Sequence, residues 1–193
     1  MNRAQALAIA LVLLAAGAAL AVFTARGGAT PVAFDGTVRA RRIPAVVLTD
    51  DRGAPLRLDA PAHGAIVIAG YTRCTDECPL TLAKVATALR PLDHRTRPQA
   101  VFVTVDPVHD DPATLHRYLR AWDNTIAGAT GERATLSRVL VALGAGDGRG
   151  PARDHDTRAF IVGRGGDVRA ELPADATPAT ITAALRALGE EHT

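Results

Sequence analysis

The chain has 193 residues, of which 48% are hydrophobic, 22% are charged and 4% are aromatic. This length suits one ordinary domain with a hydrophobic core and a short additional segment, and it leaves little room for a second domain. The 22 basic and 20 acidic residues form no block of like charge, and few aromatic rings are present to stack on bases, so we expect no nucleic-acid partner.

Residues 1–30 contain an apolar segment. Residues 4–23 carry no charge and are rich in Ala, Leu and Val. The apolar centre of a cleaved signal has about 7–15 residues, whereas a membrane span needs about 20, so the length favours an uncleaved anchor. Ala19-Leu20-Ala21 could instead serve as a cleavage site. We expect attachment to a bacterial cytoplasmic membrane, with the rest of the chain on the periplasmic or outer side, and secretion after signal cleavage as the alternative.

A polar tether over residues 31–42 precedes the folded domain, which we expect to cover residues 43–193. In chain order, the patterns predict hairpin strands over 43–49 and 56–58, a strand over 65–71, a helix over 80–92, a strand over 100–105, a helix over 112–122, a strand over 126–129, a helix over 136–143, a glycine-rich loop over 144–154, hairpin strands over 158–162 and 167–172, and a helix over 178–188. Strands that alternate with helices in this way predict an α/β fold with a central mixed sheet flanked by helices.

The only two cysteines, Cys74 and Cys78, lie between the strand at 65–71 and the helix at 80–92. In α/β sheets, reactive groups collect where the carboxyl end of a strand meets the amino end of a helix. Unpaired N–H groups at a helix start favour a thiolate over a thiol, and Pro79 suits the first helical position.

Three roles for this cysteine pair can be distinguished. A disulfide can persist in an exported protein, but the loop between the two cysteines is too small for a disulfide to stabilise the domain appreciably. A redox couple and a metal site both remain open, because the sulfurs can reach each other or one ion. Two soft thiolates suit Cu(I) or Zn(II), which needs at least one more ligand.

Histidine is the obvious further donor, and the chain has six: His63, His94, His109, His116, His155 and His192. His155 lies in Asp154-His155-Asp156-Thr157, directly before the strand at 158–162 and after the glycine-rich loop. A loop at this point can fold over a neighbouring strand end. This position sets His155 apart from the other five.

Three motifs occur in order along the chain: Gly70-Tyr71-Thr72-Arg73-Cys74-Thr75-Asp76-Glu77-Cys78-Pro79, then Thr104-Val105-Asp106-Pro107-Val108-His109-Asp110-Asp111-Pro112, then Asp154-His155. Together they resemble the successive signatures of the Sco/SenC family, over residues 43–188. Members of that family are membrane-tethered proteins with a thioredoxin-like fold that bind copper and help assemble the binuclear copper centre of cytochrome c oxidase. This sequence departs from the family pattern at Thr75, His109 and Asp111, and its loop at 144–154 is short.

The resemblance implies that Cys74 and Cys78 supply thiolate ligands and His155 an imidazole ligand for one copper ion, Cu(I) or Cu(II). It implies a copper chaperone that delivers copper to a cytochrome c oxidase subunit, or keeps the cysteines of that copper centre reduced. We expect a monomer or a weak dimer. Oxidation of Cys74 and Cys78 to a disulfide would remove two copper ligands at once.

Two alternatives use the same cysteines without metal. A membrane-tethered thiol-disulfide oxidoreductase would be served equally well by exposed thiolates at a helix start, although it has no need of His155. A peroxidase would need Thr72 and Arg73 to activate Cys74, and both residues directly precede it. Asp106-Pro107 most simply forms a turn, and its place after a strand near the cysteines leaves a supporting role open.

Overall fold

The computed structural model describes Gln5 and residues 41–147 and 158–190. The expected anchor, almost all of the tether, His155 and most of the loop at 144–154 lie outside these residues. None of the helices in the described ranges combines the length and the apolar character needed to cross a membrane.

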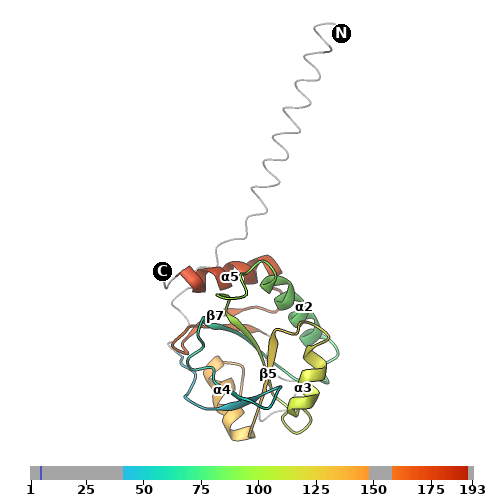
Figure 1. Ribbon diagram of the computed structural model, residues 1–193, viewed down its shortest axis with the longest axis vertical. Coiled ribbons are helices and arrows are strands. Elements are labelled where there is room, and N and C mark those ends of the chain that lie inside the picture. Colours follow the sequence, from blue (N-terminus) through green and yellow to red (C-terminus); the bar gives the residue numbers. More distant parts are fainter. Residues whose placement is uncertain (1–4, 6–40, 148–157, 191–193) are drawn as a thin grey trace. The chain divides into compact units, whose positions relative to one another are not determined.

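Seven strands form one sheet, and four helices pack against it within the described part of the chain (Figure 1). The strands are β1 (Leu48–Asp50), β2 (Pro55–Leu56), β3 (Ala65–Gly70), β4 (Gln99–Thr104), β5 (Ile126–Thr130), β6 (Ala159–Val162) and β7 (Val168–Leu172). The helices are α2 (Glu77–Leu89), α3 (Pro112–Leu119), α4 (Arg133–Leu143) and α5 (Pro178–Glu190).

The strand order in the sheet is β2-β1-β5-β4-β3-β6-β7. The strands β3, β4 and β5 run parallel to one another, whereas all other neighbours in the sheet pair antiparallel. The sheet is therefore mixed, which confirms the predicted α/β architecture. Because β3 and β4 are parallel neighbours, the loops that follow them leave the same edge of the sheet side by side.

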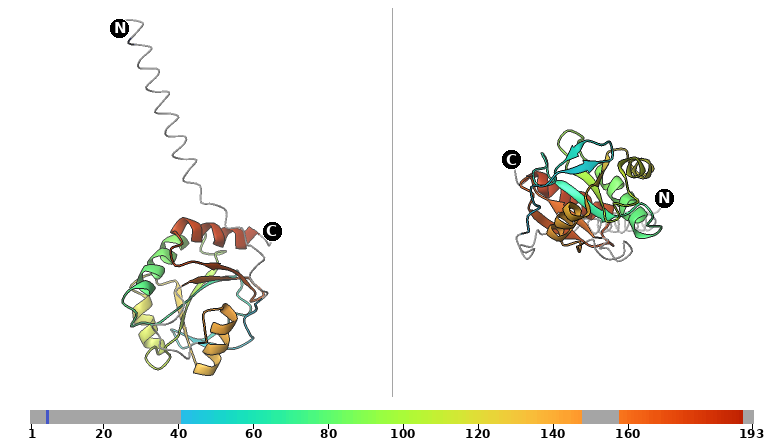
Figure 2. Two further views of the ribbon diagram at one scale, coloured as in Figure 1. Left: turned by 180° about the vertical axis from the view of Figure 1, so that it is seen from behind. Right: turned by 90° about the horizontal axis from the view of Figure 1, so that it is seen from below.

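Alternate residues of the inner strands face opposite layers of the core. In β3, Ile66 and Ile68 pack in the layer of α2, α3 and α5, whereas Val67 packs in the layer of α4. Figure 2 shows α2 and α3 on one side of the sheet and α4 on the other. Both faces of the sheet are covered, so every residue of β3 is buried. This double burial explains why the sequence of β3 is a continuous apolar run.

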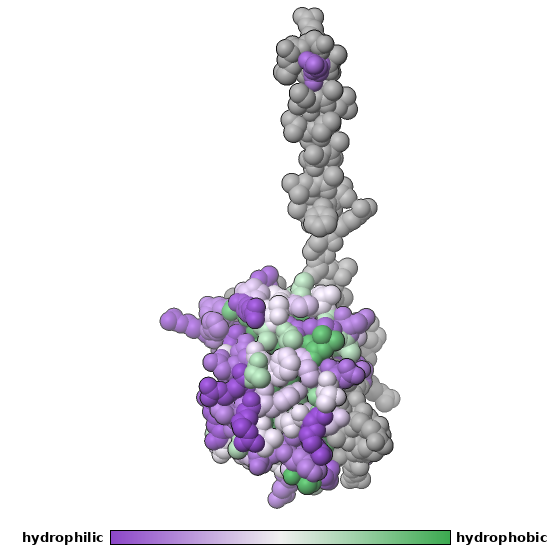
Figure 3. Space-filling model, turned by 90° about the vertical axis from the view of Figure 1, so that its right-hand side faces the viewer, coloured by the Kyte–Doolittle hydropathy of each residue, from purple (hydrophilic) through white to green (hydrophobic). Residues whose placement is uncertain are grey.

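The helices are amphipathic, as their spacing predicts. α2 buries Leu82, Val85 and Leu89, and α3 buries Leu115 and Leu119. On the side of the domain that carries α2 and α3, the remaining hydrophobic residues form small patches among hydrophilic and neutral ones (Figure 3).

Several element boundaries differ from the prediction. α2 begins at Glu77 rather than at residue 80, so Cys78 is its second residue and Pro79 its third. Proline is tolerated throughout the first helical turn, because N–H groups there have no intrahelical acceptor. α3 ends at Leu119, before Trp122.

The first hairpin is shorter than predicted, but its turn lies between the two predicted strands. β1 and β2 pair antiparallel over only two residue pairs. The carboxylate of Asp50 accepts the N–H groups of Arg52 at 2.9 Å and Ala54 at 2.7 Å. Gly53 adopts a positive φ of 83°, which glycine tolerates best.

Candidate functional site

The two cysteines lie where β3 ends and α2 begins, at residues 71–78. We call residues 71–76 the cysteine loop. Within it, the N–H of Cys74 donates to the carbonyl of Tyr71 at 3.1 Å, which closes a tight turn. The N–H of Cys78 donates to Sγ of Cys74 at 3.5 Å. No disulfide joins the two cysteines, and the fold brings them together at the junction of strand and helix.

The two thiols differ in exposure and in pKa. Burial of the half-buried Cys74 raises its pKa, but hydrogen bonds from N–H groups at the start of α2 and from the Cys78 thiol outweigh burial, so its pKa lies below the usual value. Cys78 is only 1% exposed, and burial raises its pKa to about 12. In the reduced protein, Cys74 therefore ionises first and Cys78 remains its hydrogen-bond donor. Cys78 is therefore a buried thiol rather than an exposed thiolate.

Gly70, the last residue of β3, lets the core approach Cys78 closely. A Cβ atom at this position would lie 2.6–2.7 Å from the Phe102 ring and 2.9 Å from Sγ of Cys78, which is closer than real Cβ contacts. The aromatic packing continues outward from Phe102. Its ring centroid is 5.9 Å from that of Tyr118, which is 6.4 Å from that of Trp122. Phe102, Tyr118 and Trp122 thus pack in series within the same part of the core as the buried Cys78.

The acidity of the Tyr118 hydroxyl depends on the two cysteines and on Asp110. Burial raises the pKa of Tyr118, and negative charge on Cys78, Cys74 or Asp110, when these groups are ionised, raises it further. The hydroxyl oxygen is buried and has no hydrogen-bond partner among the described residues. Tyr118 therefore keeps its proton at neutral pH.

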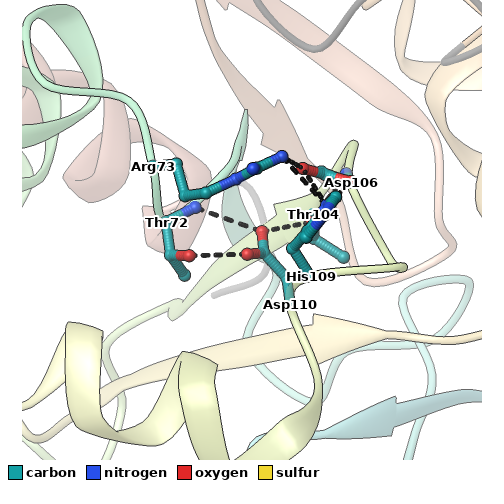
Figure 4. A network of polar contacts seen from close by, with 6 residues as sticks. All are labelled: Thr72, Arg73, Thr104, Asp106, His109 and Asp110. Carbon is teal, nitrogen blue, oxygen red and sulfur yellow. Dashed lines mark hydrogen bonds and ion pairs between the residues drawn. The ribbon is translucent and has the colours of Figure 1, made fainter.

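A buried carboxylate joins the cysteine loop to the loop after β4 (residues 105–111). Asp110 is fully buried, and its carboxylate accepts the N–H of Thr72 at 3.1 Å, the hydroxyl of Thr72 at 2.6 Å and the hydroxyl of Thr104 at 2.6 Å (Figure 4). Three hydrogen bonds offset much of the cost of burying this carboxylate, which forms no ion pair with any residue in the described ranges. Thr72 is two residues before Cys74, so Asp110 helps to set the position of the cysteine loop.

A second, more exposed contact joins the same two loops. Asp106 accepts a hydrogen bond from the Arg73 guanidinium at 2.7 Å, and its oxygens lie 3.0 Å from Nδ1 of His109. Burial raises the pKa of Asp106, but the hydrogen bonds from His109 and Arg73 outweigh burial, so its pKa is lowered. The supporting role that the sequence left open for Asp106 thus has a structural basis.

These contacts bear on the remaining sequence predictions. Thr72 and Arg73 are engaged with Asp110 and Asp106, which argues against their acting on Cys74 as in a peroxidase. Within residues 41–147 and 158–190, no three His, Cys, Asp or Glu side chains are grouped as a metal site. The predicted third ligand, His155, lies outside those ranges.

Thr104 and Asp110 belong to the second motif of the sequence, but sequence reasoning assigned no role to either. Asp110 precedes Asp111, which caps α3 by accepting the N–H of Thr114 at 2.7 Å. The available signal was position: polar residues at the carboxyl end of a buried strand lie at the reactive edge of the sheet.

The arrangement can bind a soft metal ion or exchange a disulfide. Cys74 offers an accessible sulfur of lowered pKa. The sulfur of Cys78 lies within hydrogen-bond distance of the Cys74 thiolate. A metal that binds both sulfurs must displace the Cys78 proton.

A family model described as SCO1/SenC matches residues 40–190. The mouse mitochondrial protein SCO2 homolog is 34% identical over 96 residues, which cover 48% of this chain and 38% of that protein. The matched region covers 53% of a putative copper-binding protein of Stutzerimonas stutzeri and 38% of the mouse protein, so the chain spans about half or less of the length of these relatives.

Solved structures agree with this match. ScoI of Bradyrhizobium japonicum, solved with copper bound, is 25% identical with a TM-score of 0.64, covering 75% of this chain and 98% of that one. Yeast Sco1 is 21% identical with a TM-score of 0.68, covering 78% and 99%. The likeness confirms the thioredoxin-like fold. Because the family model covers most of the chain, this protein belongs to the SCO1/SenC family.

Proposed function

We propose that this protein is a copper chaperone that delivers copper to the binuclear copper centre of cytochrome c oxidase or keeps the cysteines of that centre reduced. Family membership supports a role in oxidase assembly, and the related ScoI of Bradyrhizobium japonicum has been solved with copper bound. The observation that carries the proposal is the pair formed by Cys74 and Cys78, whose sulfurs approach each other at the sheet edge.

We assign the copper ligands to Cys74, Cys78 and His155. Two thiolates and an imidazole suit Cu(I) and Cu(II), which take soft sulfur and nitrogen donors. Copper is the cargo of this site rather than a resident cofactor. A site with few protein ligands leaves room for an incoming ligand from the acceptor, which favours transfer over permanent storage.

Anaerobic copper titration of the reduced full chain in detergent tests the ligand assignment. We expect one tightly held copper per parent chain, none in the Cys74→Ala/Cys78→Ala variant, and weaker binding in His155→Ala. His94→Ala is the matched control, because His94 is exposed on another loop. Equal copper binding by the parent and by all variants would contradict the assignment.

A second candidate function is a thiol-disulfide oxidoreductase that acts without metal. The difference in pKa between Cys74 and Cys78 favours this function. The partly exposed Cys74, whose pKa is lowered, can attack a disulfide of the acceptor, and the Cys78 thiol can then release the acceptor by attacking the mixed disulfide. Both functions need the two cysteines, but only copper binding needs His155. Disulfide reduction that is insensitive to His155→Ala, in a chain that binds no copper, would favour the oxidoreductase.

We also propose that residues 1–30 anchor the protein in the cytoplasmic membrane, with the domain on the periplasmic or outer side. The uncharged stretch at 4–23 has the length of a membrane span. Carbonate extraction of membranes followed by protease treatment of intact spheroplasts tests this arrangement. Retention in the membrane and digestion of the domain are expected, and release by carbonate would contradict an anchor.

A further inference from the structure

Two adjoining cavities lie near the start of β3 and of β4, whereas the cysteine loop follows the end of β3. A cavity of about 390 Å³ opens between the loop at 92–98, the turn at 163–166 and the last turns of α5. An adjoining cavity of about 200 Å³ shares His63, Arg97 and Pro98 with it. We call the two cavities together the basic hollow. It contains no residue of the cysteine loop or of the loop after β4.

The lining of the basic hollow is strongly cationic. Three arginines, Arg97, Arg164 and Arg186, line the larger cavity. Among the described residues that line either cavity, Asp93 alone is acidic. Its carboxylate accepts the N–H of Arg95 at 2.9 Å, within its own loop. The hollow therefore concentrates positive charge at one place on a chain whose net charge is only +2.

The three arginines make few contacts with other side chains. Arg97 donates to the carbonyl of Leu89 at 3.5 Å, and Arg164 lies 3.4 Å from Nδ1 of His63. Neither contact is an ion pair, and no described carboxylate pairs with Arg97, Arg164 or Arg186. Guanidinium groups that outnumber the acidic residues around them and form no ion pair with those described attract an anion, and their planar N–H donors match phosphate oxygens in pairs.

The same cavity has an apolar component. Leu92, Pro98 and Leu185 contribute to its lining, and Leu92 is the one of the three that is partly exposed. Binding pockets typically combine an apolar lining with a few convergent polar groups, and about 390 Å³ is large enough for a small organic ligand. An inorganic ion would use the arginines alone, whereas an ester would use both components.

From this combination we propose that the basic hollow binds a phosphate group carried on a small apolar moiety. The phosphate would accept hydrogen bonds from Arg97 and Arg164, and Arg186 would add positive charge at the rim. The apolar moiety would lie against Leu92, which is partly exposed. Free phosphate and the phosphate ester of an amphiphile share this chemistry, and the experiment separates them. The proposal does not depend on copper binding.

Isothermal titration calorimetry of the full chain in a zwitterionic detergent tests the proposal. The probes are inorganic phosphate, hexyl phosphate and hexyltrimethylammonium, which has the same alkyl tail as hexyl phosphate but a positive charge. The variants are Arg97→Gln and Arg164→Gln; the second removes an exposed side chain, so it should not disturb folding. Arg138→Gln on α4 is the control, because it removes the same charge from an exposed site on the other face of the sheet.

We expect hexyl phosphate to bind more tightly than inorganic phosphate, and each arginine variant to bind it about tenfold more weakly or worse than Arg138→Gln does. Equal binding of the two phosphates, with the same dependence on arginine, would support the anion site and identify free phosphate as its ligand. The proposal would be overturned if neither phosphate bound, if hexyltrimethylammonium bound as well as hexyl phosphate, or if the three variants behaved alike.

Discussion

The carboxylate of Asp110 accepts both the N–H of Thr72, at 3.1 Å, and its hydroxyl, at 2.6 Å, although the two residues are 38 positions apart in the sequence. The contact fixes the start of the cysteine loop to the loop after β4. Because β3 and β4 are adjacent and parallel, this is a contact between neighbouring strand ends. The position of Cys74 therefore depends on a residue outside its own loop.

Replacing Asp110 by asparagine should destabilise the domain. The amide oxygen can accept two of the three hydrogen bonds, and the NH2 group can form the third only if the Thr72 hydroxyl turns to accept it. Charge-assisted hydrogen bonds are thus replaced by weaker neutral ones. We expect the free energy of unfolding to fall by about 1–3 kcal/mol. Urea unfolding of the reduced protein measures this change. Asp175→Asn, at an exposed position, is the control, and equal stability of the two variants would contradict the account of Asp110.

Replacing Gly70 by alanine should overpack the site. The added methyl group would overlap the Phe102 ring and Sγ of Cys78, so the core must shift to admit it. We expect a loss of roughly 1–3 kcal/mol in unfolding free energy. Gly131→Ala is the matched control, because its nearest neighbour would be at 3.5 Å. The close approach at Gly70 would be refuted if both variants unfolded at the same urea concentration.

The two cysteines should react at different rates with iodoacetamide. The thiolate is the reactive form, and Cys74 has the lower pKa and the greater exposure. In the reduced native protein, we expect mass spectrometry to find the label on Cys74, with Cys78 protected. The rate at Cys74 should rise with pH and reach its half-maximum at a lower pH than in the urea-unfolded chain. Equal labelling of both cysteines in the native protein would contradict the difference in burial.

Asp106 should make stability depend on acid pH. Its pKa is lower in the folded protein than in the unfolded chain, because His109 and Arg73 stabilise the carboxylate. As pH falls, the unfolded chain therefore takes up this proton first. The stability that the carboxylate contributes is complete above the unfolded pKa of about 3.9 and is lost as pH falls through the folded pKa.

Asp106→Asn removes this contribution at every pH. We expect the parent to be more stable than the variant at pH 7, and the difference between them to shrink as the pH is lowered through and below about 4. Urea unfolding at a series of pH values measures the difference. A difference that stayed constant over this range would show that Asp106 contributes no such pH dependence.

Much of the fold could be predicted because burial leaves a periodic pattern in the sequence. The runs at 65–71 and 100–105 are almost entirely apolar because both faces of β3 and β4 are buried. The cysteines could be placed at a strand end and a helix start for the same reason. The start of α2 was harder to predict, because Pro79 is compatible with several positions in a first turn.

The contacts of the loops could not be predicted in the same way. The hydrogen bonds of Asp110 with Thr72 and Thr104 depend on which strands are neighbours, and hydrophobic periodicity does not encode strand order. The burial of Cys78 depends likewise on Gly70 and Phe102, which come from two different strands. Such residues are recognised once the parallel pairing of β3 and β4 is known.

X-ray absorption spectroscopy of the full chain loaded anaerobically with Cu(I) tests the proposed ligand set most directly. We predict two sulfur ligands and one imidazole nitrogen in the parent and in the His94→Ala control. The imidazole contribution should disappear in His155→Ala, and the Cys74→Ala/Cys78→Ala variant should hold no copper at this site. Copper coordinated without sulfur, or an imidazole contribution that persists in His155→Ala, would contradict the assignment of Cys74, Cys78 and His155 as the copper ligands.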